Sequence, residues 1–179
     1  MLNCRNQRVS NRSSNHQDVT AGAQTIRYVP DADLRVLDPI FTTAGTTLNH
    51  GVMIYDFLIA PDGKNQPQPQ MLESWNASAD GLTYTFKLRQ GVKWHDGKPF
   101  TSADVKCTWD ALIGKGDEKM DLIRKNPRKV WYNNLKEVTT NGPNEVTFVL
   151  GRPQPSFLTM LAGGYSPVYS CHVPGRDMR

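Results

Sequence analysis

The chain has 179 residues, of which 38% are hydrophobic, and its formal net charge at pH 7 is +4. This length suffices for one substantial domain or two small ones. Basic residues concentrate between Lys115 and Lys136, but acidic residues are mixed with them, whereas a nucleic-acid-binding surface needs one sign of charge interleaved with aromatic side chains. No apolar run approaches the ~20 residues that a membrane-spanning helix requires. Composition therefore argues against nucleic-acid binding and against a membrane-spanning chain.

Residues 1–23 are rich in Asn, Ser, Gln and Arg and contain no apolar stretch. A secretory signal peptide combines a basic tip, an apolar core and a small-residue cleavage site. A lipoprotein role for Cys4 would also need a preceding hydrophobic segment. Residues 1–23 are therefore predicted to be a disordered polar leader, and no signal peptide is visible in this sequence.

Short elements are predicted between this leader and residue 72. Ile26, Tyr28 and Pro30 fall on one face of an extended segment, as the period of two in a strand requires. Prolines at 67 and 69 remove backbone donors and favour a connection. The predicted order is a strand over 24–30, a turn at 38–39, a loop over 41–49 leading into a helix through residue 53, a strand over 55–60 and a connection over 65–70.

The region 73–95 has the clearest strand pattern in the chain. Leu82, Tyr84, Phe86 and Leu88 alternate with polar residues, which is the pattern of a half-buried strand. Three dipeptides ending in glycine, at 80–81, 90–91 and 96–97, supply turns because glycine accepts positive φ at no steric cost. An antiparallel β-meander is predicted, with these four side chains facing inward.

A helix is predicted from Thr101 to about Ile113. Thr101 can act as the N-cap, and Asp104 three residues later can complete a capping box. Phe100 before the cap can pack against Val105. Glycine at 114 and 116 ends the helix.

The remaining sequence alternates between short helical and extended segments. Part of 117–136 is predicted to be helical, with an interruption at 126–127 where a proline follows asparagine. Strands are predicted over 136–140 and 145–150, joined by the turn 141–144, followed by a short helix over 155–162 and a strand over 166–170. Mixed helices and antiparallel hairpins indicate an α+β (mixed α/β) fold, not a doubly wound parallel sheet.

Catalytic motifs are absent from the sequence. It contains no Gly-x-Ser-x-Gly elbow and no glycine-rich phosphate loop with a lysine. His95 and Asp96 invite interpretation as a catalytic dyad, but adjacent residues on a strand point to opposite faces. A turn pair explains them better, so the chain is predicted not to be an enzyme.

Three cysteines, at 4, 107 and 171, form an odd set. Cys107 lies on the predicted helix and is most simply a small core residue, although a bridge to Cys171 stays open. No Cys or His pairs have zinc spacing, so neither a metal nor a cofactor is predicted. His50 is either a helix-terminal residue or a single ligand contact.

Four tryptophans, at 75, 94, 109 and 131, are interpreted mainly as core residues, with ligand stacking as the alternative.

The order of residues in 73–105 resembles that of the family 5 bacterial extracellular solute-binding proteins, the peptide and nickel receptors of ATP-binding cassette importers. The resemblance rests on ESW at 73–75, DGLTYTF at 80–86, LR at 88–89, GV at 91–92, HDG at 95–97, PFT at 99–101 and DV at 104–105. It extends to LDP at 37–39, to the strand over 54–58, to VTFVL at 146–150 and to the proline-led segment 153–162, and covers roughly 24–174.

This resemblance implies a fold like that of the type II periplasmic binding proteins. Family members are more than twice as long and bind solute between two lobes, so residues 24–179 are expected to form part of the amino-terminal lobe only. It further implies a periplasmic location, a small peptide or similar solute as ligand and an inner-membrane ABC permease as partner.

The family segment that matches the loop over 41–49 faces the cleft between the lobes. Thr42, Thr43, Thr46 and Asn49 are therefore expected to contact the ligand, and ordinary loop and cap chemistry is the alternative. A second reading of the whole chain is a truncated interaction module that transports nothing.

Overall fold

The computed structural model describes residues 27–116 and 126–173. Residues 1–30 form one unit and residues 31–179 another. In the first unit only residues 27–30 are described, and they carry no helix or strand. Among the described residues no helix is long and apolar enough to cross a membrane.

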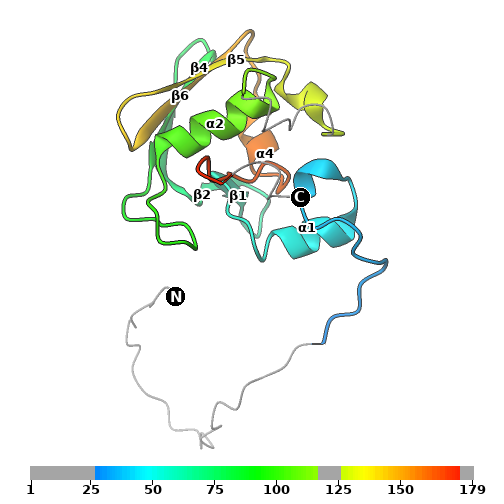
Figure 1. The fold of residues 1–179 in the computed structure, drawn as a ribbon. Coiled ribbons are helices and arrows are strands. Elements are labelled where there is room, and N and C mark those ends of the chain that lie inside the picture. The colour runs from blue at the N-terminus through cyan, green and yellow to red at the C-terminus, as the bar shows by residue number, and fades with distance from the viewer. Residues whose placement is uncertain (1–26, 117–125, 174–179) are drawn as a thin grey trace, which may run out of the picture. The chain divides into compact units, whose positions relative to one another are not determined.

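A four-stranded antiparallel sheet organises the second unit (Figure 1). Its strands are β3 (Leu72–Ala77), β4 (Thr83–Leu88), β5 (Leu135–Thr140) and β6 (Glu145–Leu150). Their order across the sheet is β3-β4-β6-β5. Two sequence-local hairpins, β3-β4 and β5-β6, thus join through the pairing of β4 with β6.

The alternation predicted for β4 is confirmed. Tyr84, Phe86 and Leu88 are buried, whereas Leu82 precedes the strand and is half-buried. Phe86 and Phe148 meet edge to face, with 5.0 Å between ring centroids, and Trp109 meets Phe148 at 5.3 Å. This aromatic cluster joins the inner face of the sheet to the helix above it, and such edge-to-face pairs add to the burial of their area.

The predicted meander over 73–95 requires a third strand after the turn at 90–91, and that part of the prediction is wrong. Residues 92–95 do not join the sheet, and Lys93 makes only an isolated bridge with Pro99. A strand has two edges, and both edges of β4 are occupied, one by β3 and the other by β6. The segment after Leu88 therefore turns away and forms a loop beside the sheet.

Helix α2 (Ser102–Leu112) forms where a helix was predicted, and it covers β5 and β6 (Figure 1). Thr101 is its N-cap, and the Asp104 carboxylate accepts hydrogen bonds from the Thr101 backbone N–H (2.9 Å) and hydroxyl (3.3 Å). Phe100 and Val105 are both buried in the core. Ser102 additionally ties the helix to the β5-β6 turn, because its hydroxyl donates to the Gly142 carbonyl oxygen (2.6 Å).

A second, two-stranded sheet replaces the connection predicted over 65–70. Strand β1 (Ile59–Pro61) pairs with β2 (Pro67–Pro69). Proline lacks a donor but keeps its carbonyl acceptor, so it is tolerated in such an edge pair. The Asp62 carboxylate holds the turn by accepting the N–H groups of Lys64 (2.8 Å) and Gln66 (2.9 Å).

Among the described residues, four short helices complete the fold. They are η1 (Pro39–Phe41), α1 (Gly45–Gly51), η3 (Lys129–Tyr132) and α4 (Phe157–Leu161). Helix η1 replaces the turn predicted at 38–39, α1 begins inside the loop predicted over 41–49, and η3 and α4 fall within segments predicted to be helical. The helix predicted in 117–136 falls partly on residues 117–125, which lie outside the described residues.

Two predicted strands are wrong. Of the strand predicted over 24–30, residues 24–26 lie outside the described residues and 27–30 are coil, with Tyr28 and Val29 largely exposed. Residues 166–170 contribute only an isolated bridge, between Pro167 and Phe57. A strand needs a neighbouring edge along its length, and among the described residues neither segment pairs with one.

Candidate functional site

The predicted contact residues Thr42 and Thr43 follow η1 in a short loop. The Thr42 hydroxyl accepts the Ala44 backbone N–H (3.1 Å), so it is used in a local turn. The Thr42 carbonyl oxygen accepts a hydrogen bond from Arg128 Nη1 (2.7 Å). Thr43 is exposed.

Thr46 and Asn49 lie three residues apart on α1 but differ in exposure. Thr46 is 7% exposed, whereas Asn49 is exposed. The neighbouring Thr47 hydroxyl donates to the Val36 carbonyl oxygen (2.6 Å), which ties this face of α1 to the preceding segment. Thr42, Thr43 and Asn49 are therefore open to a solute to differing degrees, and Thr46 is packed inside.

Arg128 fixes the position of this loop, and the sequence alone did not single it out. Its guanidinium carbon lies 3.4 Å from the ring centroid of Tyr165 and 5.5 Å from that of Trp131. The side chain thus combines cation–π contacts with its bond to Thr42. Arg128 is one of many charges in a mixed stretch, so no sequence pattern distinguishes it.

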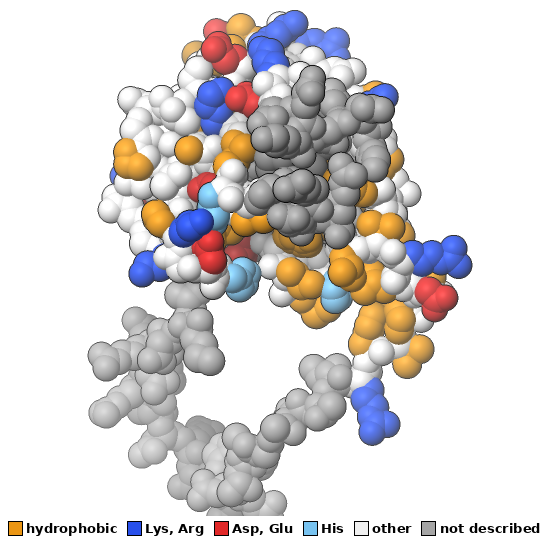
Figure 2. All heavy atoms as spheres, viewed as in Figure 1, with side chains coloured by type: hydrophobic (Ala, Val, Ile, Leu, Met, Phe, Trp, Pro, Cys, Tyr) orange, Lys and Arg blue, Asp and Glu red, His pale blue; other side chains and the backbone are white. Residues whose placement is uncertain are grey.

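Hydrophobic side chains are exposed at the end of α1. Val52, Met53 and Ile54 are 54%, 74% and 49% exposed. Figure 2 shows hydrophobic side chains gathered on this part of the surface. Consecutive exposed residues of this kind are typical of a surface that contacts another molecule.

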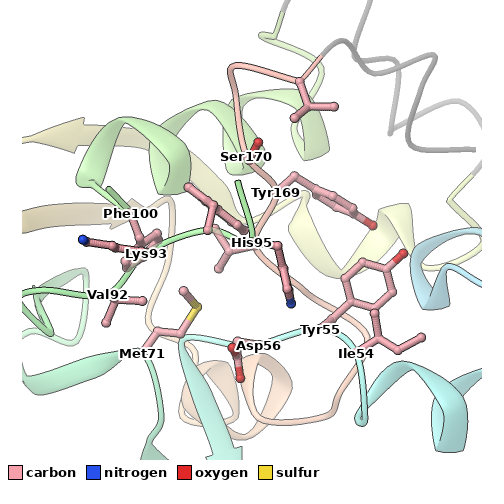
Figure 3. Close-up of a pocket in the computed structure, with 13 residues that line it drawn as sticks. Ile54, Tyr55, Asp56, Met71, Val92, Lys93, His95, Phe100, Tyr169 and Ser170 are labelled. Carbon is pink, nitrogen blue, oxygen red and sulfur yellow. The ribbon is translucent and has the colours of Figure 1, made fainter. Parts of the chain in front are cut away.

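A cavity of about 210 Å³ begins beside this exposed segment (Figure 3). Segments from four parts of the chain converge on it, and Met71, Val92 and His95 point toward its interior. The lining comprises Ile54, Tyr55, Asp56, Met71, Val92, Lys93, Trp94, His95, Phe100, Val168, Tyr169, Ser170 and Val173. Most of these side chains are apolar, so the cavity favours apolar groups.

Trp94, one of the residues that line the cavity, carries a buried polar atom. The indole N–H of Trp94 is buried and makes no hydrogen bond among the described residues. Its ring packs edge to face against Phe100, with 5.9 Å between centroids. A buried donor without an acceptor costs free energy on the order of 1–3 kcal/mol.

Two tyrosines of the cavity lining, Tyr55 and Tyr169, lie near the buried carboxylate of Asp38. The Tyr169 hydroxyl donates to both oxygens of Asp38 (2.6 and 2.7 Å), and the Ile40 N–H donates to Oδ1 (2.9 Å). Burial raises the pKa of Asp38, although hydrogen bonding from Tyr169 and from the Ile40 N–H opposes the shift. Burial, followed by the nearby Asp38 carboxylate, raises the pKa of Tyr169 well above its ordinary value.

Burial also raises the pKa of Tyr55, whose ring meets that of Tyr169 edge on at 6.2 Å. The tyrosine side of the cavity thus stays uncharged at neutral pH. Asp38 belongs to the LDP motif, and its role here is to hold η1 and the segment around Tyr169 together.

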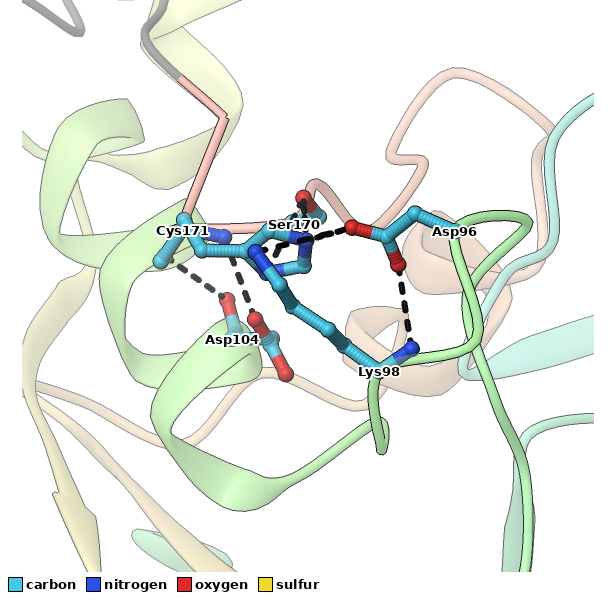
Figure 4. Close-up of polar contacts among 6 residues, drawn as sticks. Asp96, Lys98, Asp104, Ser170 and Cys171 are labelled. Carbon is cyan, nitrogen blue, oxygen red and sulfur yellow. Dashed lines mark hydrogen bonds and ion pairs between the residues drawn. The ribbon is translucent and has the colours of Figure 1, made fainter.

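A clamp on α2, made of Asp104, Cys107 and Thr108, holds the segment 169–171 that lines the cavity. Asp104 Oδ1 accepts the Cys171 N–H (3.1 Å; Figure 4), and Thr108 Oγ1 accepts the Tyr169 N–H (2.9 Å). Cys107 and Cys171 form a disulfide. The interpretation of Cys107 as an ordinary core residue is therefore wrong, because the helix places its Cα 6.2 Å from that of Cys171.

His172 continues this segment and binds Asp96. Its Nε2 lies 2.6 Å from Asp96 Oδ2, and the Lys98 N–H donates to Asp96 Oδ1 (3.1 Å; Figure 4). Chiefly because of this N–H, the pKa of Asp96 is lowered. Ser170 Oγ lies 3.4 Å from both ring nitrogens of His172.

These residues do not form a catalytic triad. A triad places the carboxylate and the hydroxyl on opposite ring nitrogens of the histidine, whereas here Asp96 occupies the nitrogen that the serine also approaches. The pair ties the loop after β4 to the segment that follows Tyr169. Within residues 27–116 and 126–173, no three His, Cys, Asp or Glu side chains lie together as a metal site.

Comparison with known proteins yields one family. The profile of the bacterial extracellular solute-binding proteins, family 5 (middle region), matches residues 66–174. The probable peptide ABC transporter periplasmic-binding protein y4tO of Sinorhizobium fredii is 38% identical over 140 residues, which cover 74% of this chain and 26% of that protein. The dipeptide-binding protein of Escherichia coli is 32% identical over 163 residues, covering 83% and 30%.

A solved structure agrees with these relatives. The oligopeptide-binding protein AppA of Bacillus subtilis, in complex with a nonapeptide, superimposes with a TM-score of 0.66 at 29% identity. The superposition covers 79% of this chain and 27% of that one. The chain thus spans only 26–30% of the length of these two curated relatives.

Proposed function

This chain belongs to the family 5 bacterial extracellular solute-binding proteins, and from that membership we propose that it is part of the substrate-binding component of an ABC importer for peptides or similar small solutes. The observation that carries the proposal is the match over residues 66–174, supported by relatives named for peptide binding. Members of this family bind solutes and do not transform them, in agreement with the prediction of a non-enzyme.

Within such a receptor, residues 24–179 serve as part of the amino-terminal lobe of a type II periplasmic binding fold. Solute contacts Thr42, Thr43 and Asn49 from the cleft side, and Thr46 supports the loop from inside. The second lobe closes over the solute by a hinge motion, and the closed receptor docks on the inner-membrane permease. Relatives named as periplasmic-binding proteins support a periplasmic location.

This arrangement predicts weak binding by the present chain alone. Sites that hold small molecules well enclose about 70–90% of the ligand surface. In the segment 42–49, residues 43–45 and Asn49 are exposed at the surface, so a peptide bound there keeps much of its own surface in water while it still loses its translational freedom.

Amide chemical-shift titration with trialanine tests the proposal, because it detects weak complexes residue by residue. We expect saturable shifts concentrated in residues 42–49, and we expect Asn49→Ala to reduce the affinity. The matched control is Asn76→Ala, an exposed asparagine on β3. Shifts that fail to saturate, or that fall equally on both asparagines, would contradict the assignment.

A second function is favoured by one observation. The exposed run Val52–Ile54 is suited to protein contact, so the chain can also act as an interaction module. Self-association or co-purification that is lost in Met53→Ser, without any peptide-induced shift, would support this alternative over solute binding.

A further inference from the structure

The turn 141–144 between β5 and β6 contains an asparagine that is followed by glycine, and this is the only such dipeptide in the sequence. Asn141 and Gly142 are both exposed. Gly142 has a φ of +72°, and a Cβ added to it would meet open space. Because glycine has no side chain and no neighbour crowds it, the backbone nitrogen of Gly142 is sterically open to the side chain of Asn141.

The hydrogen bonds of this turn leave the same two groups accessible. The turn lies between β5, which ends at Thr140, and β6, which begins at Glu145. Among the described residues, no acceptor takes the Gly142 N–H. The Asn141 side-chain amide donates to Glu145 Oε1 (2.7 Å), but this contact lies at the surface, where water competes for both partners. Neither group is therefore withdrawn from reaction.

From this arrangement we infer that Asn141 is a site of spontaneous deamidation. The Gly142 nitrogen loses its proton to water and bonds to Asn141 Cγ, which closes a five-membered ring. The Cγ–Nδ2 bond then breaks, Nδ2 leaves as ammonia with a proton taken from water, and a succinimide remains. Water adds to one of the two ring carbonyl carbons and breaks the bond from that carbon to nitrogen, which yields aspartate or isoaspartate. In sum, one water is consumed and one ammonia is released.

The modification changes the contact between this turn and α2. Ser102 at the start of α2 donates its hydroxyl to the Gly142 carbonyl oxygen (2.6 Å) and its N–H to the Pro143 carbonyl oxygen (2.8 Å; Figure 1). Isoaspartate inserts an extra backbone methylene before Gly142, which displaces both acceptors. Either product also places a carboxylate beside Glu145, where the Asn141 amide donated before, and neighbouring like charges repel. Deamidation therefore loosens the first turn of α2.

Ageing of the full chain in mildly alkaline buffer tests the site, because base removes the proton from the attacking nitrogen. Peptide mapping by mass spectrometry follows each asparagine. We expect Asn141 to be converted completely while Asn76, an exposed asparagine that precedes alanine on β3, is still intact, since the alanine Cβ hinders attack. We also expect aspartate and isoaspartate together at position 141. Equal rates at the two asparagines, or aspartate alone, would overturn the inference.

A variant and an exchange measurement complete the test. Gly142→Ala adds a Cβ beside the attacking nitrogen and is expected to slow the loss of the Asn141 amide severalfold; an unchanged rate in the folded variant, checked by circular dichroism, would overturn backbone attack. We expect the Ser102 N–H to exchange with solvent about fivefold faster in the aged protein than in the fresh one, as the loss of one ordinary hydrogen bond predicts. The amide of Phe86 on β4 is the control. Unchanged exchange at Ser102 after complete conversion would refute the effect on α2.

Discussion

Removal of the Cys107–Cys171 disulfide is the sharpest test of how the cavity wall is held. The two cysteines are 64 residues apart in sequence. In the chain-entropy description, closing a loop of this length restricts the unfolded chain by about 4 kcal/mol, and measured effects are commonly 2–4 kcal/mol. Without the disulfide, Asp104 and Thr108 still hold the segment by hydrogen bonds, so the native fold is kept. We therefore expect the free energy of unfolding to fall by about 2–4 kcal/mol.

Urea unfolding of Cys107→Ala/Cys171→Ala measures this loss. For a slope of ~2 kcal/mol per molar urea, the middle of the ~1–3 range for small proteins, the expected loss lowers the transition midpoint by about 1–2 M. Cys4→Ala is the matched control, because it removes the remaining thiol and leaves the disulfide in place. The chain has three cysteines, and two of them are in the disulfide. A thiol reagent should therefore titrate one thiol in the native protein.

Two results would refute this reasoning. A double variant whose stability stays within about 0.5 kcal/mol of Cys4→Ala would show that the disulfide does not constrain the unfolded chain. Three titratable thiols in the oxidised native protein would show that Cys107 and Cys171 are not bonded.

Three further predictions concern single side chains. Asp104→Ala leaves two backbone N–H groups without their acceptor and is expected to cost about 2–4 kcal/mol, against about 0.5–1 kcal/mol for Thr101→Ala, in chemical denaturation; equal costs would contradict the capping geometry. Arg128→Lys loses the planar stacking on Tyr165 and is expected to cost about 1–2 kcal/mol, with near-ultraviolet circular dichroism reporting the tyrosine environment. Burial raises the pKa of Asp38 above 3.8, so its contribution to stability is complete in acid and is lost as pH rises through the folded-state pKa. The free energy of unfolding of Asp38→Asn should therefore increase relative to that of the wild type between acid and neutral pH, and a difference that does not change with pH would contradict the shift.

The local elements were predictable because local chemistry determines them. Alternation around Phe86 specifies β4, and the Thr101–Asp104 pair specifies the start of α2, since each pattern carries its own hydrogen bonds or buried face. The pairing of β4 with β6 was not predictable in this way. It depends on contacts between residues such as Tyr84 and Phe148, and no short-range pattern encodes them.

The same distinction between local and long-range contacts applies to the candidate site. The loop at 42–49 came from resemblance, and its role in binding stays a prediction. The cavity was missed because its lining comes from segments around Tyr55, Trp94 and Tyr169, which are distant in sequence. The disulfide was left open for the same reason, because only the folded helix α2 shows that Cys107 faces Cys171.

The strand order β3-β4-β6-β5 also determines when the sheet can form during synthesis. The β3-β4 hairpin can pair as soon as Leu88 has left the ribosome, but β4 waits for β6, which ends at Leu150. The bond between Asp38 and Tyr169 spans 131 residues and forms later still. Until then the apolar face of the first hairpin lacks its final cover, so the nascent chain passes through an aggregation-prone stage.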